Sequence, residues 1–376
     1  MAKKPTDSEI ISLLKDGVSA GIKFNDTKLS VERRRVMEYY NGRLPAPVHG
    51  GNSKYVSTDV FDCLESMKAT LLETFSAHAD IVQFSAKNDD DLAEAAQASA
   101  YTKHVIFEQN DGTELFGSIF HDGLSSRNAI IQVHWEDKTE RVPEEFKDQS
   151  EDSLAVLLAD DGVDIEEIEI DPQTGLVSGS LTREERKAQV RIELIPPEEF
   201  IVNPNIKSLF ASPQLSRRTE KSKSDLIKEG YPKAKVKELS TGDNELSLES
   251  ERVQRFSAVS TSFGNNEERQ EASKLFTVYE TYAWLDLDNR GSTALWRIVH
   301  SGNTVLEKEV VERHPFLSFA PLPIPHSFYG TNFSTKVIPV QNAKTILTRS
   351  ILDHAVLANN PRYGVEIGRA SCRERV

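Results

Sequence analysis

Apolar residues recur every three or four positions in five stretches of the chain, the pattern of helices that bury one face. The strongest stretch is residues 56–76, where Ser57 or Thr58 can cap the first turn. The other predicted helices are residues 8–40 with a break near Asn25, 88–109, 115–129 and 328–357. The apolar stripe of the last helix consists of Val337, Val340, Ile346, Leu347, Ile351, Leu352 and Val356.

Alternation of apolar and polar residues predicts strands elsewhere. The expected strands are residues 81–84, 130–137, a strand beginning at 188, 200–202, and three antiparallel strands within 275–311. A turn around Gly291 and another at Gly302 separate the last three. The sequence therefore predicts an α+β fold in which long helices dominate a smaller antiparallel β region.

Composition narrows the class of protein. A chain of 376 residues, 38% hydrophobic and 28% charged, is long enough for two or three globular domains. It has no apolar run near the roughly 20 residues of a membrane span, and its start lacks the apolar core of a secretory signal. The two cysteines, Cys63 and Cys372, make no disulfide framework, which indicates a reducing compartment, most simply a cytoplasm.

Charge is distributed unevenly. The net charge of −14 argues against an ordinary nucleic-acid binder, although an acidic wall would let an enclosed DNA duplex slide. Residues 144–171 hold twelve acids and one lysine, which predicts a solvated insertion with a short helix near 154–158. Two alternatives are an acidic surface facing a basic partner or a DNA channel, and a metal site. The metal site would consist of Asp160, Asp161, Asp164 and Glu166.

A basic segment follows at residues 216–238, with eight lysines and arginines around a predicted short helix at 224–229. It is interpreted as a solvated helix face, or as a contact for DNA or an acidic partner. Residues 241–273 are polar and predict a long loop or weak helix.

Motifs for chemistry are missing from the sequence. It contains no P-loop, no GxGxxG and no HExxH. Residues 286–291 imitate the start of a calcium loop, but its twelfth position is Arg297 instead of glutamate, which favours a hairpin turn. We therefore predict no catalytic residue, no metal site and no cofactor, and a structural protein instead of an enzyme.

Four segments in order resemble the portal (head-to-tail connecting) proteins of tailed bacteriophages, particularly those of podovirus-type short-tailed phages. The first is YYNG followed by GGNSKYVSTDVFDCLESMKATLLETF, and the second is DDDLAEAAQASAYTKHVIFEQND leading into FGSIFHDGLSSRNAIIQVHWED. The third is IPPEEFIVNPNIKS. The fourth begins PFLSFAPLPIPHSFYG and continues through the predicted last helix to residue 365.

The resemblance implies a dodecameric ring at one capsid vertex, assembled in the host cytoplasm, through which double-stranded DNA is packaged and ejected without sequence specificity. It implies contacts with the terminase large subunit, the major capsid and scaffolding proteins and tail adaptor proteins, and none with a membrane. Residues 1–203 would form a wing, 204–274 a basic stem-like helix and polar linker, 275–318 a clip, and 319–365 a second stem helix. Lys336, Lys344 and Arg349 on that helix are candidate channel-facing or DNA-facing residues.

Two further interpretations concern the last residues of the chain and the alternatives to a portal protein. Residues 366–376, EIGRASCRERV, resemble the in-frame translation of a sequencing adapter, so we expect a C-terminally truncated portal chain. Another virion adaptor or scaffold-binding protein, and a metal-dependent phage enzyme built on the acidic cluster, stay open as alternatives.

Overall fold

The computed structural model describes residues 5–43, 53–76, 81–149, 163–170, 177–239, 250–256, 270, 273–288 and 291–359. The chain divides into two compact units. The first contains residues 1–79, 116–131 and 194–376, and the second contains residues 80–115 and 132–193. Helices and antiparallel sheets are mixed in the chain, which confirms the predicted α+β class.

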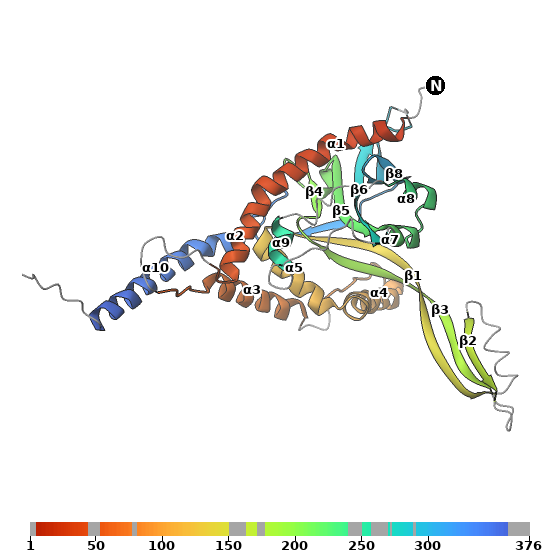
Figure 1. The fold of residues 1–376 in the computed structure, drawn as a ribbon, viewed down its shortest axis with the longest axis horizontal. Helices are drawn as coiled ribbons and strands as arrows, with labels where there is room; N and C mark the ends of the chain where they lie inside the picture. The colour runs from red at the N-terminus through yellow and green to blue at the C-terminus, as the bar shows by residue number, and fades with distance from the viewer. Residues whose placement is uncertain are drawn as a thin grey trace, which may run out of the picture. The chain divides into compact units, whose positions relative to one another are not determined.

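A five-stranded antiparallel sheet forms the centre of the first unit, in the order β4-β5-β6-β7-β8 (Figure 1). Its strands are β4 (Phe200–Val202), β5 (Gln214–Ser222), β6 (Leu275–Leu285), β7 (Ala294–Ser301) and β8 (Thr304–Val310). The three strands predicted within residues 275–311 and the strand at 200–202 are confirmed. The sequence did not reveal that β5, within the basic segment, pairs with β6 from Gln214↔Ala283 to Ser222↔Leu275.

Both faces of this sheet are covered. Helix α1 (Asp7–Phe24) lies along one face (Figure 1), where Ile10 and Leu14 pack on Ile298. Helices α7 (Lys223–Lys228) and α8 (Lys233–Glu238) bring Leu226 and Val236 against Phe276 and Val278 of β6. Because neighbouring side chains of a strand point to opposite faces, covers on both faces bury five of the eight residues of β7 and leave the other three partly buried.

The first helical stretch is continuous where the sequence predicts a break. Helix α1 leads through a π-helical turn, η1 (Asn25–Leu29), into α2 (Ser30–Tyr40). Gly21 lets α1 approach β4 closely, because a Cβ there would lie 2.5 Å from the Ile201 side chain. The break predicted near Asn25 corresponds to this π-helical turn. The helix changes its pitch there without ending, and Asn25 becomes buried.

The remaining elements of the first unit are mainly helical. They are α3 (Asp59–Ser76), most of α5 (Gly112–Ser126), η4 (Leu209–Ala211), α9 (Ser250–Phe256), β9 (Phe316–Phe319) and α10 (Phe333–Asn359). The predicted helices at 56–76, 115–129 and 328–357 are thus confirmed, with ends that differ by at most five residues. The short helix predicted at 224–229 is α7, which ends one residue earlier.

The second unit contains η2 (Asp89–Asp91), α4 (Leu92–His104), η3 (Val105–Gln109) and most of the strands β1 (Ala129–Gln149), β2 (Val163–Ile170) and β3 (Val177–Ile195). The sheet order is β2-β3-β1-β9, with β1 starting in the first unit and continuing into the second. Asn110 joins η3 to β3 because its amide donates to the carbonyls of Val105 and Val190 at 2.8 and 2.9 Å.

Two predictions in this unit need correction or fall outside the description. The strand predicted at 81–84 is wrong, since those residues form no ladder and the Phe84 amide donates instead to Ser99 Oγ of α4 at 2.9 Å. The short helix predicted near 154–158 lies outside the described residues. The described parts of the acidic segment belong to β1 and β2, and β2 pairs with β3 from Val163↔Arg183 to Ile170↔Val177.

Candidate functional site on helix α10

Helix α10, which carries the candidate channel residues, is held in the first unit by a mainly polar face. Its buried residues are Ser334, Ile338, Gln341 and Thr345. Their spacing of four, three and four places them on one side of the helix. They face α2 and α3, the helices that α10 contacts most, and only Ile338 among them is apolar, packing with Val36 and Val60.

Gln341 and Thr345 bond directly to the backbone at the start of α3. The Val60 amide donates to Gln341 Oε1 at 2.8 Å, and Gln341 Nε2 donates to the Tyr39 carbonyl at 3.2 Å. The Ser57 amide donates to Thr345 Oγ1 at 3.1 Å. The first backbone amides of a helix have no hydrogen-bond partner within that helix. The side chains of α10, about 280 residues later in the sequence, supply these partners at the start of α3.

Replacing Gln341 by leucine tests this attachment. We expect the free energy of unfolding to fall by about 1–3 kcal/mol, because the Val60 amide would stay buried without a partner. The Tyr39 carbonyl would still accept from the Gly42 amide. Urea unfolding measures the change. The matched control, Leu347→Gln on the exposed side of the same helix, should change it by less than about 0.5 kcal/mol, and equal losses would contradict the capping role.

The three candidate channel residues do not share one face. Lys344 Nζ pairs with Asp59 Oδ1 at 2.8 Å, and Arg349 Nε donates to the Tyr55 carbonyl at 2.6 Å. The bonds from Lys344 and Ser57 hold the pKa of Asp59 below its usual range. Lys336 is exposed. Successive residues of a helix are rotated by 100° about its axis. Lys336 and Lys344 are therefore 80° apart around α10, and Arg349 is another 140° from Lys344 in the same direction.

The apolar stripe predicted on this helix is mostly exposed. Val340, Leu347 and Ile351 are 59%, 64% and 68% exposed, and Leu352 and Val356 are 43% and 50% exposed. Against the described residues of the chain, α10 therefore packs with its polar face, whose side chains bond to the start of α3, and not with its apolar face.

A buried ionic cluster lies where η1, α2, α9 and the loop before β4 meet. Arg33 Nε donates to both carboxylate oxygens of Glu251, at 2.8 and 3.0 Å, and the two side chains are 6% and 2% exposed. Arg255 donates to both oxygens of Glu198, each at 2.8 Å. Arg33 also bonds Asn25, the residue that the π-helical turn directs inward. Two cations thus balance two anions, of which Arg33, Glu251 and Glu198 are buried and Arg255 is 34% exposed.

Asp122, on α5, borders this cluster. Burial raises its pKa to about 7; Glu198 and Glu251 raise it further, while Arg255 and Arg33 oppose the rise. Burial also raises the pKa of Glu251, against the opposing effect of Arg33, and lowers the pKa of the neighbouring His121. This cluster was not predicted from the sequence, although the PPEEF motif that contains Glu198 lies in a segment that carries the portal resemblance.

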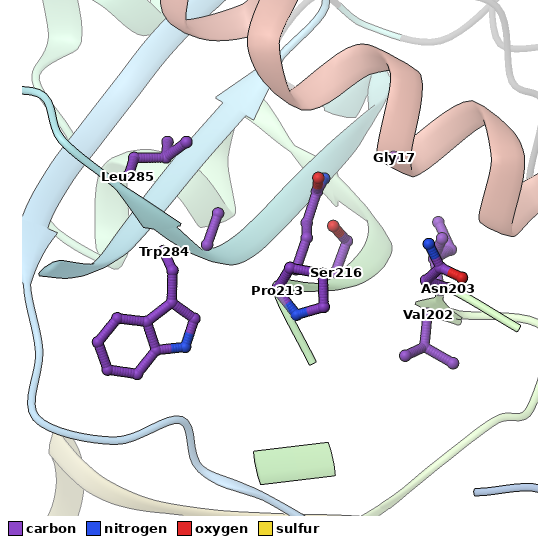
Figure 2. Close-up of a pocket in the computed structure, with 10 residues that line it drawn as sticks. Gly17, Val202, Asn203, Pro213, Ser216, Trp284 and Leu285 are labelled. Atoms are coloured by element: carbon purple, nitrogen blue, oxygen red, sulfur yellow. The ribbon is translucent and has the colours of Figure 1, made fainter. Parts of the chain in front are cut away.

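A small cavity of about 190 Å³ lies between α1 and the five-stranded sheet (Figure 2). Its lining has no acid, base, histidine or cysteine. Gln214 Nε2 donates to the Leu14 carbonyl at 3.0 Å, and Ser216 shares a hydrogen bond with Thr281. The cavity holds none of the side chains that acid–base or nucleophilic chemistry needs.

Metal-ligating side chains do not gather among the described residues, where no group of three or more could hold an ion. Of the acidic candidates, Asp160 and Asp161 lie outside the described residues. Asp164 and Glu166 lie on β2, whose backbone alone is described. Among the described helices, none is long and apolar enough to pass through a membrane.

Comparison with known proteins adds one match. Residues 10–376 match the family model described as phage SU10 portal protein, which covers nearly the whole chain. No curated protein matches the chain.

Proposed function

Because this chain belongs to the phage SU10 portal protein family, we propose that it acts as a subunit of the portal ring. The ring lies at the capsid vertex, and viral double-stranded DNA passes through it during packaging and ejection. The family match over residues 10–376 is the observation that carries this conclusion. The family is structural, and the subunit acts in the virion as part of a homo-oligomeric ring.

The finer assignments are part of the proposal. We propose a dodecamer of the podovirus type, assembled in the host cytoplasm, that docks the terminase large subunit and later tail adaptor proteins. Major capsid and scaffolding proteins would hold it in the shell. The subunit itself would catalyse no reaction, which is supported by the missing nucleotide-binding motifs in the sequence.

The division into wing, stem and clip also stays a proposal. The hairpins β6–β7 and β7–β8 support a clip within residues 275–318, although β5 and β4 extend the same sheet. The length of α10, 27 residues, supports a stem helix at 319–365. Within 204–274, the residues that the structure describes contribute β5 and the helices α7, α8 and α9 of six, six and seven residues, so a stem-like helix in this described part is short.

DNA would pass through the ring without sequence readout. The formal net charge of −14 supports weak contact with phosphates, because like charges repel and the duplex can slide. Among the three candidate contacts, Lys336 is the most exposed to an incoming phosphate, since Lys344 and Arg349 are engaged with Asp59 and Tyr55. Contacts of this kind weaken steeply as salt rises.

Electron microscopy and native mass spectrometry of the purified chain test the proposal. We expect closed rings with one central channel wide enough for a duplex, and one ring per particle at a single vertex. A different stoichiometry at another place in the particle would favour a virion adaptor or scaffold-binding protein. Metal-dependent DNA cleavage that is lost on alanine substitution of Asp160, Asp161, Asp164 and Glu166 would favour the enzyme.

A further inference from the structure

Helix α9, which lies beside α2 (Figure 1), is attached to the first unit by charged side chains. It takes part in three ion pairs with nitrogen–oxygen distances of 2.8, 2.8 and 3.2 Å: Arg33–Glu251, Arg255–Glu198 and Arg252–Glu220. Arg33 lies on α2, Glu198 comes just before β4, and Glu220 lies on β5. α9 therefore bridges α2 on one side and the strands of the five-stranded sheet on the other.

Apolar packing contributes little to this attachment. The structure describes the side chains of residues 251–255 of α9, and the apolar one among them, Val253, is 40% exposed. The cost of removing two charges from water offsets much of their attraction, so buried ion pairs fix a position without binding strongly. A helix of seven residues is also too short to persist in water by itself. Few buried apolar contacts are typical of a segment that opens locally.

The two sides that α9 bridges pack on different partners. α1 packs on the five-stranded sheet, whereas α2 packs with α3 and α10 through Val36, Val60 and Ile338. α5 joins the same helices, because Ser334 of α10 donates to the Leu124 carbonyl of α5 at 3.1 Å. We call α2, α3, α5 and α10 the helical group.

The described parts of the chain pass between the sheet and the helical group at three places, which lie together. The first is η1, between α1 and α2, and π-helical turns are a common cause of helix bending. The others join α5 to β1 and β9 to α10, and β1 and β9 belong to the sheet side because both contribute to its core. The Gly330 amide donates to Asn128 Oδ1 at 2.9 Å, and the ring centroids of Tyr329 and Phe24 are 5.6 Å apart. A bend in this region would leave the sheet and the helical group each intact.

We infer that α9 is a releasable clamp that fixes the angle between the sheet and the helical group. Its neighbours along the chain, α8 and β6, both lie on the sheet side, so α9 stays with the sheet when it releases α2. The contacts that then break are the Arg33–Glu251 pair and the hydrogen bond from Gln254 to the Arg34 carbonyl, at 3.4 Å. The candidate channel residues on α10 move with α2. The inference concerns a single subunit and does not depend on the ring, so it can fail while the proposed function stands.

Hydrogen exchange of the full chain, followed by mass spectrometry, tests the release with Glu251→Gln. The neutral side chain weakens the hold on Arg33, so we expect the amides of α9 and η1 to exchange at least tenfold faster, while β6 and β7 stay unchanged. The matched control is Lys308→Met, which removes an ion pair whose side chains are 44% and 47% exposed, and it should change none of these rates. Unchanged exchange in Glu251→Gln, faster exchange throughout the sheet, or faster exchange in α9 without η1 would each overturn the inference.

Distances between two spin labels test the change of angle. Cys63 on α3 is exposed and carries one label, and Lys15→Cys on the exposed side of α1 carries the other. Cys372→Ser keeps the end of the chain unlabelled, and an excess of unlabelled chain keeps the measured distances within one subunit. We expect one narrow distance with Glu251 intact and a second population in Glu251→Gln. A single unchanged distance in that variant would show that α9 does not set the angle, and would overturn the inference.

Discussion

Replacing Arg33 by methionine is expected to lower the free energy of unfolding by about 3–5 kcal/mol. Methionine keeps the apolar stem of the side chain but leaves the Glu251 carboxylate, 2% exposed, without its principal cation. A buried charge that loses its partner costs far more than the intact pair contributes. Urea unfolding at neutral pH measures the loss. It should shrink in acid, because Glu251 can then take up a proton.

The control for Arg33 is another arginine–aspartate or arginine–glutamate pair that water reaches. Arg186 pairs with Asp137 on neighbouring strands, with the two side chains 73% and 37% exposed. Arg186→Met should leave the free energy of unfolding nearly unchanged, because solvent screens exposed pairs. In Arg33→Met with Glu251→Gln, the loss should be smaller than in Arg33→Met alone. A double variant as unstable as the single one would show that the charge balance is not what stabilises this junction.

The sequence predicted the elements better than their associations. Helices with strong periodicity and the alternating strands at 275–311 are confirmed. Apolar residues repeat about every 3.6 positions in a helix and every 2 in a strand, so the repeat alone separates the two. The strand predicted at 81–84 is wrong, because a short apolar run does not show whether another strand is available to pair with it. The pairing of β5 with β6 was missed because 52 residues, from 223 to 274, separate the two strands, and because β5 holds three basic residues and only one aliphatic residue, Leu215.

The candidate site illustrates the same limit. The sequence gives the apolar stripe of α10, but it cannot say which face a helix turns toward its own chain. That choice is made by Gln341 and Thr345, whose side chains fit the free amides of α3, a match between segments far apart in the sequence. The buried ionic cluster likewise joins residues from four segments, of which each alone reads as an ordinary charged surface.

Asp122 provides a second large effect, which depends on pH. Its carboxyl group has a pKa of about 7 in the folded chain against 3.8 ordinarily, so the folded state keeps a proton that the unfolded state has released. Stability from this group is therefore full below about pH 4 and falls as pH rises toward 7, by up to about 1.4 kcal/mol per pH unit. Asp122→Asn removes this dependence.

At pH 8 the Asp122→Asn chain should therefore be more stable than the unmodified chain by about 2–4 kcal/mol, and near pH 4 the two should be similar. The lower end of that range allows for the partial contact of Asp122 with water. Urea unfolding between pH 4 and 8 gives the difference directly. Burial lowers the pKa values of His300 and His314, so their contribution to stability rises with pH instead of falling. Both chains contain these histidines, so their contribution cancels in the difference between the two chains. A difference that does not change with pH would mean that Asp122 is ionised in the fold and that the cluster accommodates three anions.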